Sequence, residues 1–306
     1  MPKVFISYKK GQNMSVRYED KIWFYLPDFY YKYSLNVNLI QMIKDHPEYF
    51  IDNIAIGAVY GTFPGAIWNG GRVFHGNTSI DNIRCTIENF NDLGVPIRFT
   101  FTNCLINEKH LYDTYCNLIM DAANNGINEV LINSDCLEEY LRSEYPNFKY
   151  IQSTTKCERN IDAINEACEK YYLVVPDYRD NINKEFLESL KHKEKIELLV
   201  NPYCNPECKR RAEHYKILST QQIGFSEMSE FRCPDENRGF LEVLGMYPTV
   251  LKKENIQELI QMGFKHFKIE GRTNHNVDVI ESYVYYMVKS EYKDKVRCDL
   301  IKAVWR

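Results

Sequence analysis

The stretch SIDNIRCTIENFNDLGVPIRFTFTNC, residues 79–104, holds a helical pattern and a strand pattern in direct succession. Ser79 is a typical N-cap residue, apolar residues follow it at helical spacing, and Gly94 is the residue type that most often follows a helix. The run Ile97–Thr102 is short and rich in apolar residues. Such a run is typical of a strand that is covered on both faces, as in a parallel sheet.

The same alternation extends through most of the chain, with further helical patterns at 107–126, 253–263 and 276–293. Eight runs are predicted as strands: Ile22–Leu26, Ile54–Val59, Ile97–Thr102, Glu129–Asn133, Lys149–Ser153, Tyr172–Pro176, Ile196–Val200 and His266–Ile269. Eight strands with intervening helices over about 250 residues predict an α/β protein with a (β/α)8 TIM-like barrel. The alternative is an open doubly wound sheet, although no dinucleotide-binding glycine fingerprint follows the first strand.

We expect a single domain over residues 1–306, with the barrel core at 22–290. Two stretches interrupt the alternation: a glycine-rich segment at 61–77, and an irregular insertion at 220–252 before the last strand. Long loops within a compact domain are often lids or binding loops.

The composition excludes several classes of function. The chain has 306 residues, of which 44% are hydrophobic, so it can bury a large core. Its formal net charge of −4 does not favour non-specific binding to nucleic acids. It has neither an apolar run of about 18 residues that could span a membrane nor the apolar stretch of a secretory signal. We therefore expect a cytoplasmic protein that does not associate with membranes.

Polar residues follow several of the predicted strands. Catalytic groups in a (β/α)8 barrel lie at the carboxyl ends of the strands. Asn103 follows the third strand, Asp177 and Tyr178 the sixth, and Glu270 and Arg272 the eighth. A Glu270–Arg272 pair can orient a carboxylate-bearing substrate, or it can be a salt bridge that closes the barrel. The alternative to a catalytic role at each of these positions is that the residue is polar only because it lies in a surface loop.

The segment NPYCNPECKRRAEHY, residues 201–215, brings together two cysteines and a basic run. We expect Cys204 and Cys208 at the barrel mouth, together with Cys104 and Cys233, and Cys157 is a weaker candidate. Four thiolates from separate loops can hold an iron–sulfur cluster, and zinc accepts the same ligands. The spacing differs from the C-x-x-C of a thioredoxin-like pair.

The basic run that follows the cysteines is expected to be helical. Arg210 and His214 would then share one face. Arg210 can bind an anionic substrate and His214 can donate a proton, whereas an ordinary solvated helix face is the alternative.

Two of these segments also carry a family resemblance. ELLVNPYCNPECKRRAEHY, residues 197–215, and FKIEGR, residues 267–272, resemble the collagenase-like peptidase U32 family in its short, single-barrel form. The resemblance implies a barrel with a 4Fe–4S cluster held by four cysteines. At matching positions these would be Cys104, Cys204, Cys208 and Cys233. Lys209 departs from the proline that commonly follows the second cysteine in similar sequences.

The resemblance implies oxygen-independent hydroxylation, or a related redox modification, of a small molecule, a peptide or an RNA base, in some relatives together with a second U32-like protein. Glu270, Arg272, Tyr178 and His214 are then the expected catalytic residues, and Asn103, Asp177 and Arg210 the expected substrate-binding residues. A metal-assisted peptidase and a non-catalytic accessory subunit of a heteromeric enzyme are the alternatives. Neither an HExxH nor a G-x-S-x-G motif supports the peptidase hypothesis.

Overall fold

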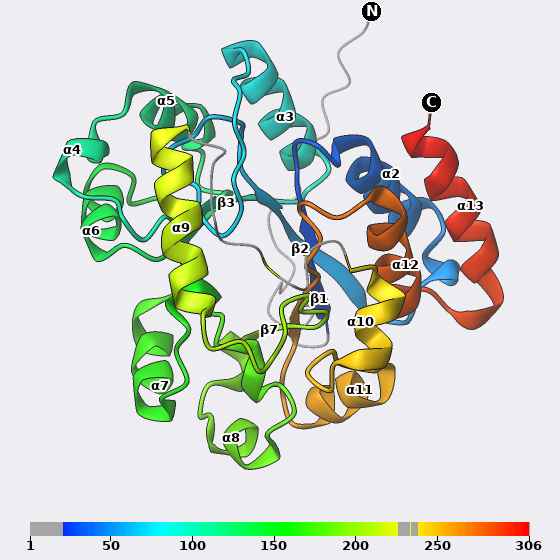
Figure 1. The fold of residues 1–306 in the computed structure, drawn as a ribbon. Coiled ribbons are helices and arrows are strands. Elements are labelled where there is room, and N and C mark those ends of the chain that lie inside the picture. Colours follow the sequence, from blue (N-terminus) through cyan, green and yellow to red (C-terminus); the bar gives the residue numbers. More distant parts are fainter. Residues whose placement is uncertain (1–20, 226–232, 234–237, 306) are drawn as a thin grey trace, which may run out of the picture.

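The computed structural model describes residues 21–225, 233 and 238–305. Eight parallel strands form one sheet in the order β6-β5-β4-β3-β2-β1-β8-β7. A parallel bridge between Val174 and Ile196 joins its two edges, so the sheet closes into a barrel and the predicted (β/α)8 fold is confirmed (Figure 1). The strands are β1 (Ile22–Pro27), β2 (Ile54–Gly61), β3 (Ile97–Phe101), β4 (Glu129–Ile132), β5 (Lys149–Gln152), β6 (Leu173–Val174), β7 (Glu197–Leu199) and β8 (His266–Lys268).

Helices surround the barrel, as Figure 1 shows. They are α2 (Tyr33–Asp45), α3 (Ile80–Asp92), α4 (Glu108–Leu111), α5 (Thr114–Ala123), α6 (Asp135–Glu144), α7 (Ile161–Lys170), α8 (Lys184–Ser189), α9 (Arg211–Gly224), α10 (Phe240–Met246), α11 (Lys253–Gln261), α12 (Asn276–Met287) and α13 (Lys293–Val304). Helix α3 begins after Ser79 as predicted, because the Ser79 side chain accepts a hydrogen bond from the Asn82 backbone N–H.

Three predicted segments were wrong in detail. The single helix expected over 107–126 is divided into α4 and α5, because Asp113 caps a new helix by accepting a hydrogen bond from the Cys116 N–H. The helix expected over 276–293 stops at Met287, where Val288 instead forms an antiparallel bridge with Phe50. The insertion at 220–252 is not wholly irregular, since it contains the end of α9 and all of α10. Its residues 226–232 and 234–237 lie outside the described part of the chain.

Two apolar regions hold the barrel together. A large one lies between the strands and the helices and includes Phe24, Ile97 and Phe267. A smaller one fills the barrel itself, with side chains from β1, β2, β4, β5 and β6: Tyr25, Ala58, Tyr60, Leu131, Ile151 and Leu173. Alternate residues of each strand therefore face inward, which is the period-2 pattern of a strand.

A buried layer of charged residues lies at the amino-terminal ends of the strands. The guanidinium of Arg98 on β3 lies between two carboxylates, with Nε 2.7 Å from Glu129 Oε2 and Nη1 2.5 Å from Glu197 Oε2. Its positive charge also lies 4.0 Å from the centre of the Tyr25 ring. Buried charges are costly unless they are paired, and this network pairs them across β3, β4 and β7.

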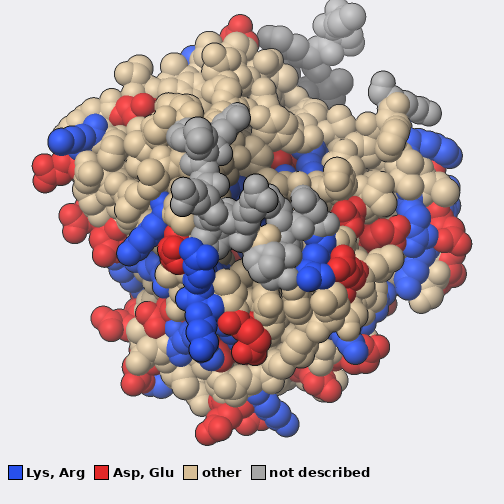
Figure 2. Space-filling view, in the orientation of Figure 1, with Lys and Arg blue, Asp and Glu red and all other residues tan. Residues whose placement is uncertain are grey.

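Among the described residues, no helix is long and apolar enough to cross a membrane. On the face drawn in Figure 2, the acidic and basic side chains of the described residues are intermingled.

Candidate functional site

A cavity of about 580 Å³ opens at the carboxyl ends of the strands. This is the end at which barrel enzymes carry their active sites. Six of the expected site residues line it: Tyr178, Cys204, His214, Cys233, Glu270 and Arg272. Five others do not lie among its lining residues: Asn103, Cys104, Asp177, Cys208 and Arg210.

Cationic side chains outnumber acidic ones among the described residues that line the cavity. Its described lining includes five Lys or Arg residues (Arg72, Arg211, Arg238, Lys268 and Arg272) against two acidic residues, Glu270 and Asp278. Low-dielectric walls strengthen the field of such charges and attract ligands of the opposite sign. Four of these five cations lie within ion-pair distance of a carboxylate, which belongs to Glu270 for Arg72, Asp177 for Arg211, Glu242 for Arg238 and Glu197 for Lys268. The attraction of an anionic ligand to the cavity therefore depends mainly on Arg272.

Arg272 lies among these cationic side chains. Its Nη1 donates hydrogen bonds to Asn69 Oδ1 at 3.0 Å and Thr100 Oγ1 at 2.8 Å, and its Nη2 donates to the Gly70 carbonyl at 2.7 Å. All three partners are neutral, and within the described part of the chain no carboxylate forms an ion pair with Arg272. Burial lowers the pKa of Arg272 to about 10, because removal from water disfavours the charged form.

The turn after β8 sets the position of Arg272. Gly271 adopts φ 156°, and a Cβ at this position would lie 2.7 Å from Val279 Cγ2. Only glycine fits such a turn without displacing α12.

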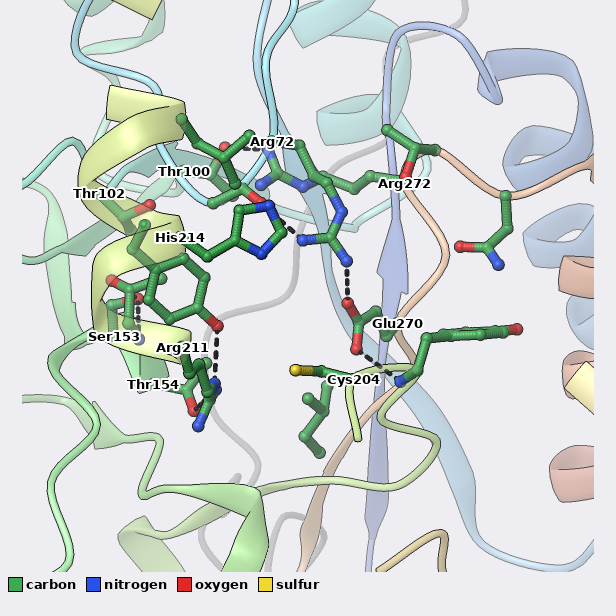
Figure 3. Close-up of a pocket in the computed structure, with 18 of the residues that line it drawn as sticks. Arg72, Thr100, Thr102, Ser153, Thr154, Cys204, Arg211, His214, Glu270 and Arg272 are labelled. Carbon is green, nitrogen blue, oxygen red and sulfur yellow. Dashed lines mark hydrogen bonds and ion pairs between the residues drawn. The ribbon is translucent and has the colours of Figure 1, made fainter. Parts of the chain in front are cut away.

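Glu270 has a different partner from the one expected. Its Oε1 lies 2.5 Å from Arg72 Nη2, and its Oε2 accepts a hydrogen bond from the Tyr203 backbone N–H at 3.3 Å. The expected pairing of Glu270 with Arg272 was therefore wrong, because the glycine-rich segment 61–77 folds over the mouth and supplies Arg72 instead. Figure 3 shows this arrangement, with Arg72 reaching Glu270 from above.

Helix α9 forms the opposite wall. Figure 3 shows Arg211 and His214 projecting from it into the cavity. Burial, with smaller effects from Arg72 and Arg210, lowers the pKa of His214 to about 4. The imidazole is therefore neutral at physiological pH and is a poor source of a proton, although it can accept or donate a hydrogen bond.

Asp177 and Tyr178 hold this wall in place. Arg211 lies with Nη1 2.6 Å from Asp177 Oδ2, and its guanidinium lies 4.4 Å from the centre of the Tyr178 ring. The Tyr178 hydroxyl donates to the backbone carbonyls of Cys204 at 3.1 Å and Asn205 at 3.2 Å. Asp177 thus positions Arg211. Of these two residues, only Tyr178 lines the cavity.

Two further expected ligand-binding residues lie outside the cavity. The Asn103 amide donates to the backbone carbonyls of Ile67 and Ser219, both at 3.1 Å, so it joins the glycine-rich segment to α9. Arg210 is exposed and forms a 2.7 Å ion pair with Glu213 along the helix. In both cases partners within the protein, distant in sequence for Asn103 and local for Arg210, occupy the side chain that was expected to bind substrate.

The cysteines expected to bind a metal lie in different surroundings. Cys204 and Cys233 line the cavity, whereas Cys104 packs against Ser219 of α9, with Sγ 3.4 Å from Oγ. Burial raises the pKa of the Cys204 thiol to about 11, so it is protonated at neutral pH. Among the described residues, which include all four proposed ligands, no three His, Cys, Asp or Glu side chains form a group that could hold a metal ion. Of the four cysteines expected to hold a cluster, only Cys204 and Cys233 line the cavity, so the described arrangement gives no support to a four-cysteine cluster there.

Some residues that line the cavity were not given a site role in the sequence analysis, among them Arg72, Thr100 and Lys268. Arg72 follows two glycines in an irregular segment, and no periodic pattern predicts where such a residue points. Thr100 and Lys268 have an inward orientation that follows from the strand period. Lys268 alternates with Glu270 and Arg272 along the eighth strand and its extension, and all three line the cavity.

The fold and the site define the class of a (β/α)8 barrel with a cavity at the carboxyl ends of its strands, in whose described lining cationic side chains outnumber acidic ones. Comparison with solved structures adds a specific likeness to the U32 peptidase Mk0906, with a TM-score of 0.53 and 13% sequence identity. The likeness covers 87% of this chain and 96% of that one. It confirms the resemblance inferred from the sequence at the level of the fold. No protein-family profile matches the chain, and no curated protein matches it.

Proposed function

We propose that this protein is a U32-type enzyme that binds an anionic substrate, a carboxylate-bearing small molecule or a short peptide, in the mouth of its barrel. The observation that carries this proposal is the partly buried guanidinium of Arg272, which faces the cavity with neutral hydrogen-bond partners. A bound carboxylate would supply the missing negative charge and offset the cost of burying the cation.

Glu270 is the proposed acid–base group. Its carboxylate is held at both oxygens, by Arg72 and by the Tyr203 N–H, so its orientation toward the cavity is fixed. A positioned carboxylate within reach of a bound substrate can accept and return a proton. The neutral His214 across the cavity is suited to hydrogen bonding with the substrate rather than to proton donation.

Binding of small anions tests the role of Arg272. The wild-type protein and Arg272→Gln would be titrated with inorganic phosphate and with glyoxylate, and the midpoint of thermal unfolding followed. We expect Arg272→Gln to weaken binding about tenfold or more, since charge-assisted hydrogen bonds contribute about 1.5–3 kcal/mol. Arg297→Gln is the matched control, because Arg297 pairs with Glu281 and Asp294 on the outer helices. Equal anion binding by the wild type and Arg272→Gln would refute the proposal.

An iron–sulfur-dependent hydroxylase is the narrower function that the resemblance implies. The arrangement of the cysteines does not support a cluster, so we derive no step through one. It stays a prediction, tested by iron, sulfide and zinc analysis of protein purified without oxygen. A brown protein with about four irons per chain, lost on Cys204→Ser, would support it. The protein without bound iron would count against it.

A peptidase is the second candidate, favoured by the name of the solved structure that shares the fold. Glu270 would then assist the attack of water on a peptide bond. Cleavage of a peptide library by the wild type, and its loss in Glu270→Gln, would support this function, whereas cleavage that survives the substitution would refute it. The expected partnership with a second U32-like protein stays a prediction, tested by co-purification.

A further inference from the structure

Lys268 at the end of β8 reaches the floor of the same cavity. It is the one lysine among the described residues that line it. Its ammonium nitrogen lies 3.6 Å from Glu197 Oε1, beyond hydrogen-bond distance, and 4.1 Å from the centre of the Tyr60 ring. Glu197 is already engaged by the guanidinium of Arg98 at 2.5 Å. Lys268 is therefore a buried amine whose nearest carboxylate is shared with another cation.

The surroundings favour the neutral form of this amine. Burial lowers the pKa of Lys268 to about 8, and the charges of Arg98 and Arg272 act in the same direction against that of Glu197. A lysine with this pKa is about one-tenth neutral at pH 7, several hundred times more than an ordinary lysine. A neutral amine in a buried site is a nucleophile toward carbonyl groups.

A group that could bind a carboxylate lines the same cavity as this amine. Lys268 and Arg272 both line the cavity, and the charge of Arg272 acts on Lys268. Thr100, which holds Arg272 through a 2.8 Å hydrogen bond, lines the same floor. A short ligand anchored at Arg272 by its carboxylate would present the neighbouring carbon to Lys268.

We propose that Lys268 forms an imine with the carbonyl group of a 2-oxo acid or aldehyde acid whose carboxylate is bound by Arg272. The inference rests on the proposed anion site and names its substrate class. The Lys268 nitrogen attacks the carbonyl carbon, a C–N bond forms, and the oxygen takes a proton from the nitrogen. The hydroxyl group then takes the second proton of the nitrogen, the C–O bond breaks and water leaves, which gives the C=N bond.

Reductive trapping with glyoxylate tests this step. Sodium cyanoborohydride delivers a hydride to the imine carbon and leaves a stable carboxymethyl group on the lysine, which peptide mapping by mass spectrometry locates. We expect Lys268 to be modified more than about tenfold faster than Lys302, a surface lysine of α13 whose side chain is 65% exposed. The rate at Lys268 should rise with pH to a midpoint near 8, matching the titration of its amine.

Variants and a second probe separate the two proposals. Arg272→Gln should slow trapping of glyoxylate at Lys268 much more than trapping of acetaldehyde, which has no carboxylate and loses only the effect of the Arg272 charge on the amine. Lys268→Arg keeps a positive charge beside Glu197 and should lower total incorporation to that of the surface lysines. If glyoxylate binds through Arg272 in the thermal assay but Lys268 is modified no faster than Lys302, the imine is refuted and the anion site stands. If Arg272→Gln alters neither binding nor trapping, the anion site is refuted as well.

Discussion

At the scale of single residues, the interior of this barrel depends on how buried charges are paired. Glu197 illustrates this, since its side chain is 0% exposed and lies between Arg98 and Lys268. Burial alone raises the pKa of a carboxyl group, yet here the charges of Arg98 and Lys268 lower the pKa of Glu197 below its ordinary value. The carboxylate is therefore charged in the folded protein and contributes to stability in that form.

Replacing Glu197 by Gln should lower the free energy of unfolding at pH 7 by about 3–5 kcal/mol, because Arg98 and Lys268 lose a buried counter-charge. The pKa of Glu197 is lower in the folded protein than in the unfolded chain, where it is about 4.3. The stabilisation by the Glu197 carboxylate is therefore complete above about pH 4.3 and disappears as the pH falls through the folded pKa. The difference between wild type and Glu197→Gln should thus shrink below about pH 4.

Urea unfolding at a series of pH values measures this difference. Glu194→Gln is the control, because the Glu194 side chain is 59% exposed and its substitution should change stability by less than about 0.5 kcal/mol. A Glu197→Gln difference that is small at pH 7, or that grows on acidification, would contradict the assigned role.

At the scale of elements, the glycine-rich segment 61–77 and α9 together build the mouth. Gln222 of α9 accepts a hydrogen bond from the Phe74 N–H at 2.8 Å and donates to the carbonyls of Ala66 and Phe74 at 3.2 and 3.1 Å. Asn69 in the same segment accepts from Arg272 and donates to Gln222 at 3.3 Å. The position of Arg272 thus depends on a loop that is held by a distant helix.

Gly70 is the point at which this segment passes closest to the barrel. A Cβ there would lie 2.4 Å from the carbonyl carbon and oxygen of Thr102 and 2.5 Å from the Asn103 backbone nitrogen. Gly70→Ala should therefore displace the segment, whose Gly70 carbonyl also binds Arg272, and weaken anion binding together with stability. We expect a loss of about 1–3 kcal/mol in the free energy of unfolding.

Gly245→Ala in α10 is the matched control. Its added Cβ meets nothing within 4 Å, and alanine should stabilise the helix by about 0.5–1 kcal/mol. Thermal unfolding and phosphate titration of both variants check the prediction. A Gly70→Ala protein with wild-type anion affinity would show that the segment does not position Arg272.

At the scale of the whole molecule, neighbouring strands of the barrel are paired over very different lengths. β1 pairs with β2 along six residue positions, whereas a single parallel bridge, Val174 to Ile196, joins β6 to β7. Fewer hydrogen bonds across a seam mean less free energy to open it.

Amide hydrogen exchange should reflect this difference. We expect peptides that cover Leu173–Val174 and Ile196 to exchange faster than those that cover β1 and β2, with protection factors about tenfold lower or more. Mass spectrometry of native-state exchange measures both regions in one sample, with intrinsic peptide rates as the reference. Equal protection at the seam and at β1 would mean that the barrel opens only as a unit.

Several features of the protein were determined by the sequence alone. Ser79 and Gly94 delimit a helix through local hydrogen bonds and backbone conformation, and the alternation of such helices with short apolar runs specifies the order of a (β/α)8 barrel. The placement of Glu270 and Arg272 at the mouth follows from the period of the eighth strand. These inferences succeed because each depends on neighbours within a few residues.

Other features were decided only by the tertiary structure. The partner of Glu270 is 198 residues away in the chain, and the Glu197 that binds Arg98 is 99 residues away. Of the four cysteines expected to hold a cluster, Cys104 and Cys208 do not line the cavity, and Cys104 instead contacts Ser219 of α9. Long-range pairing of charges and thiols depends on how loops fold across a closed sheet, and no local pattern encodes that path.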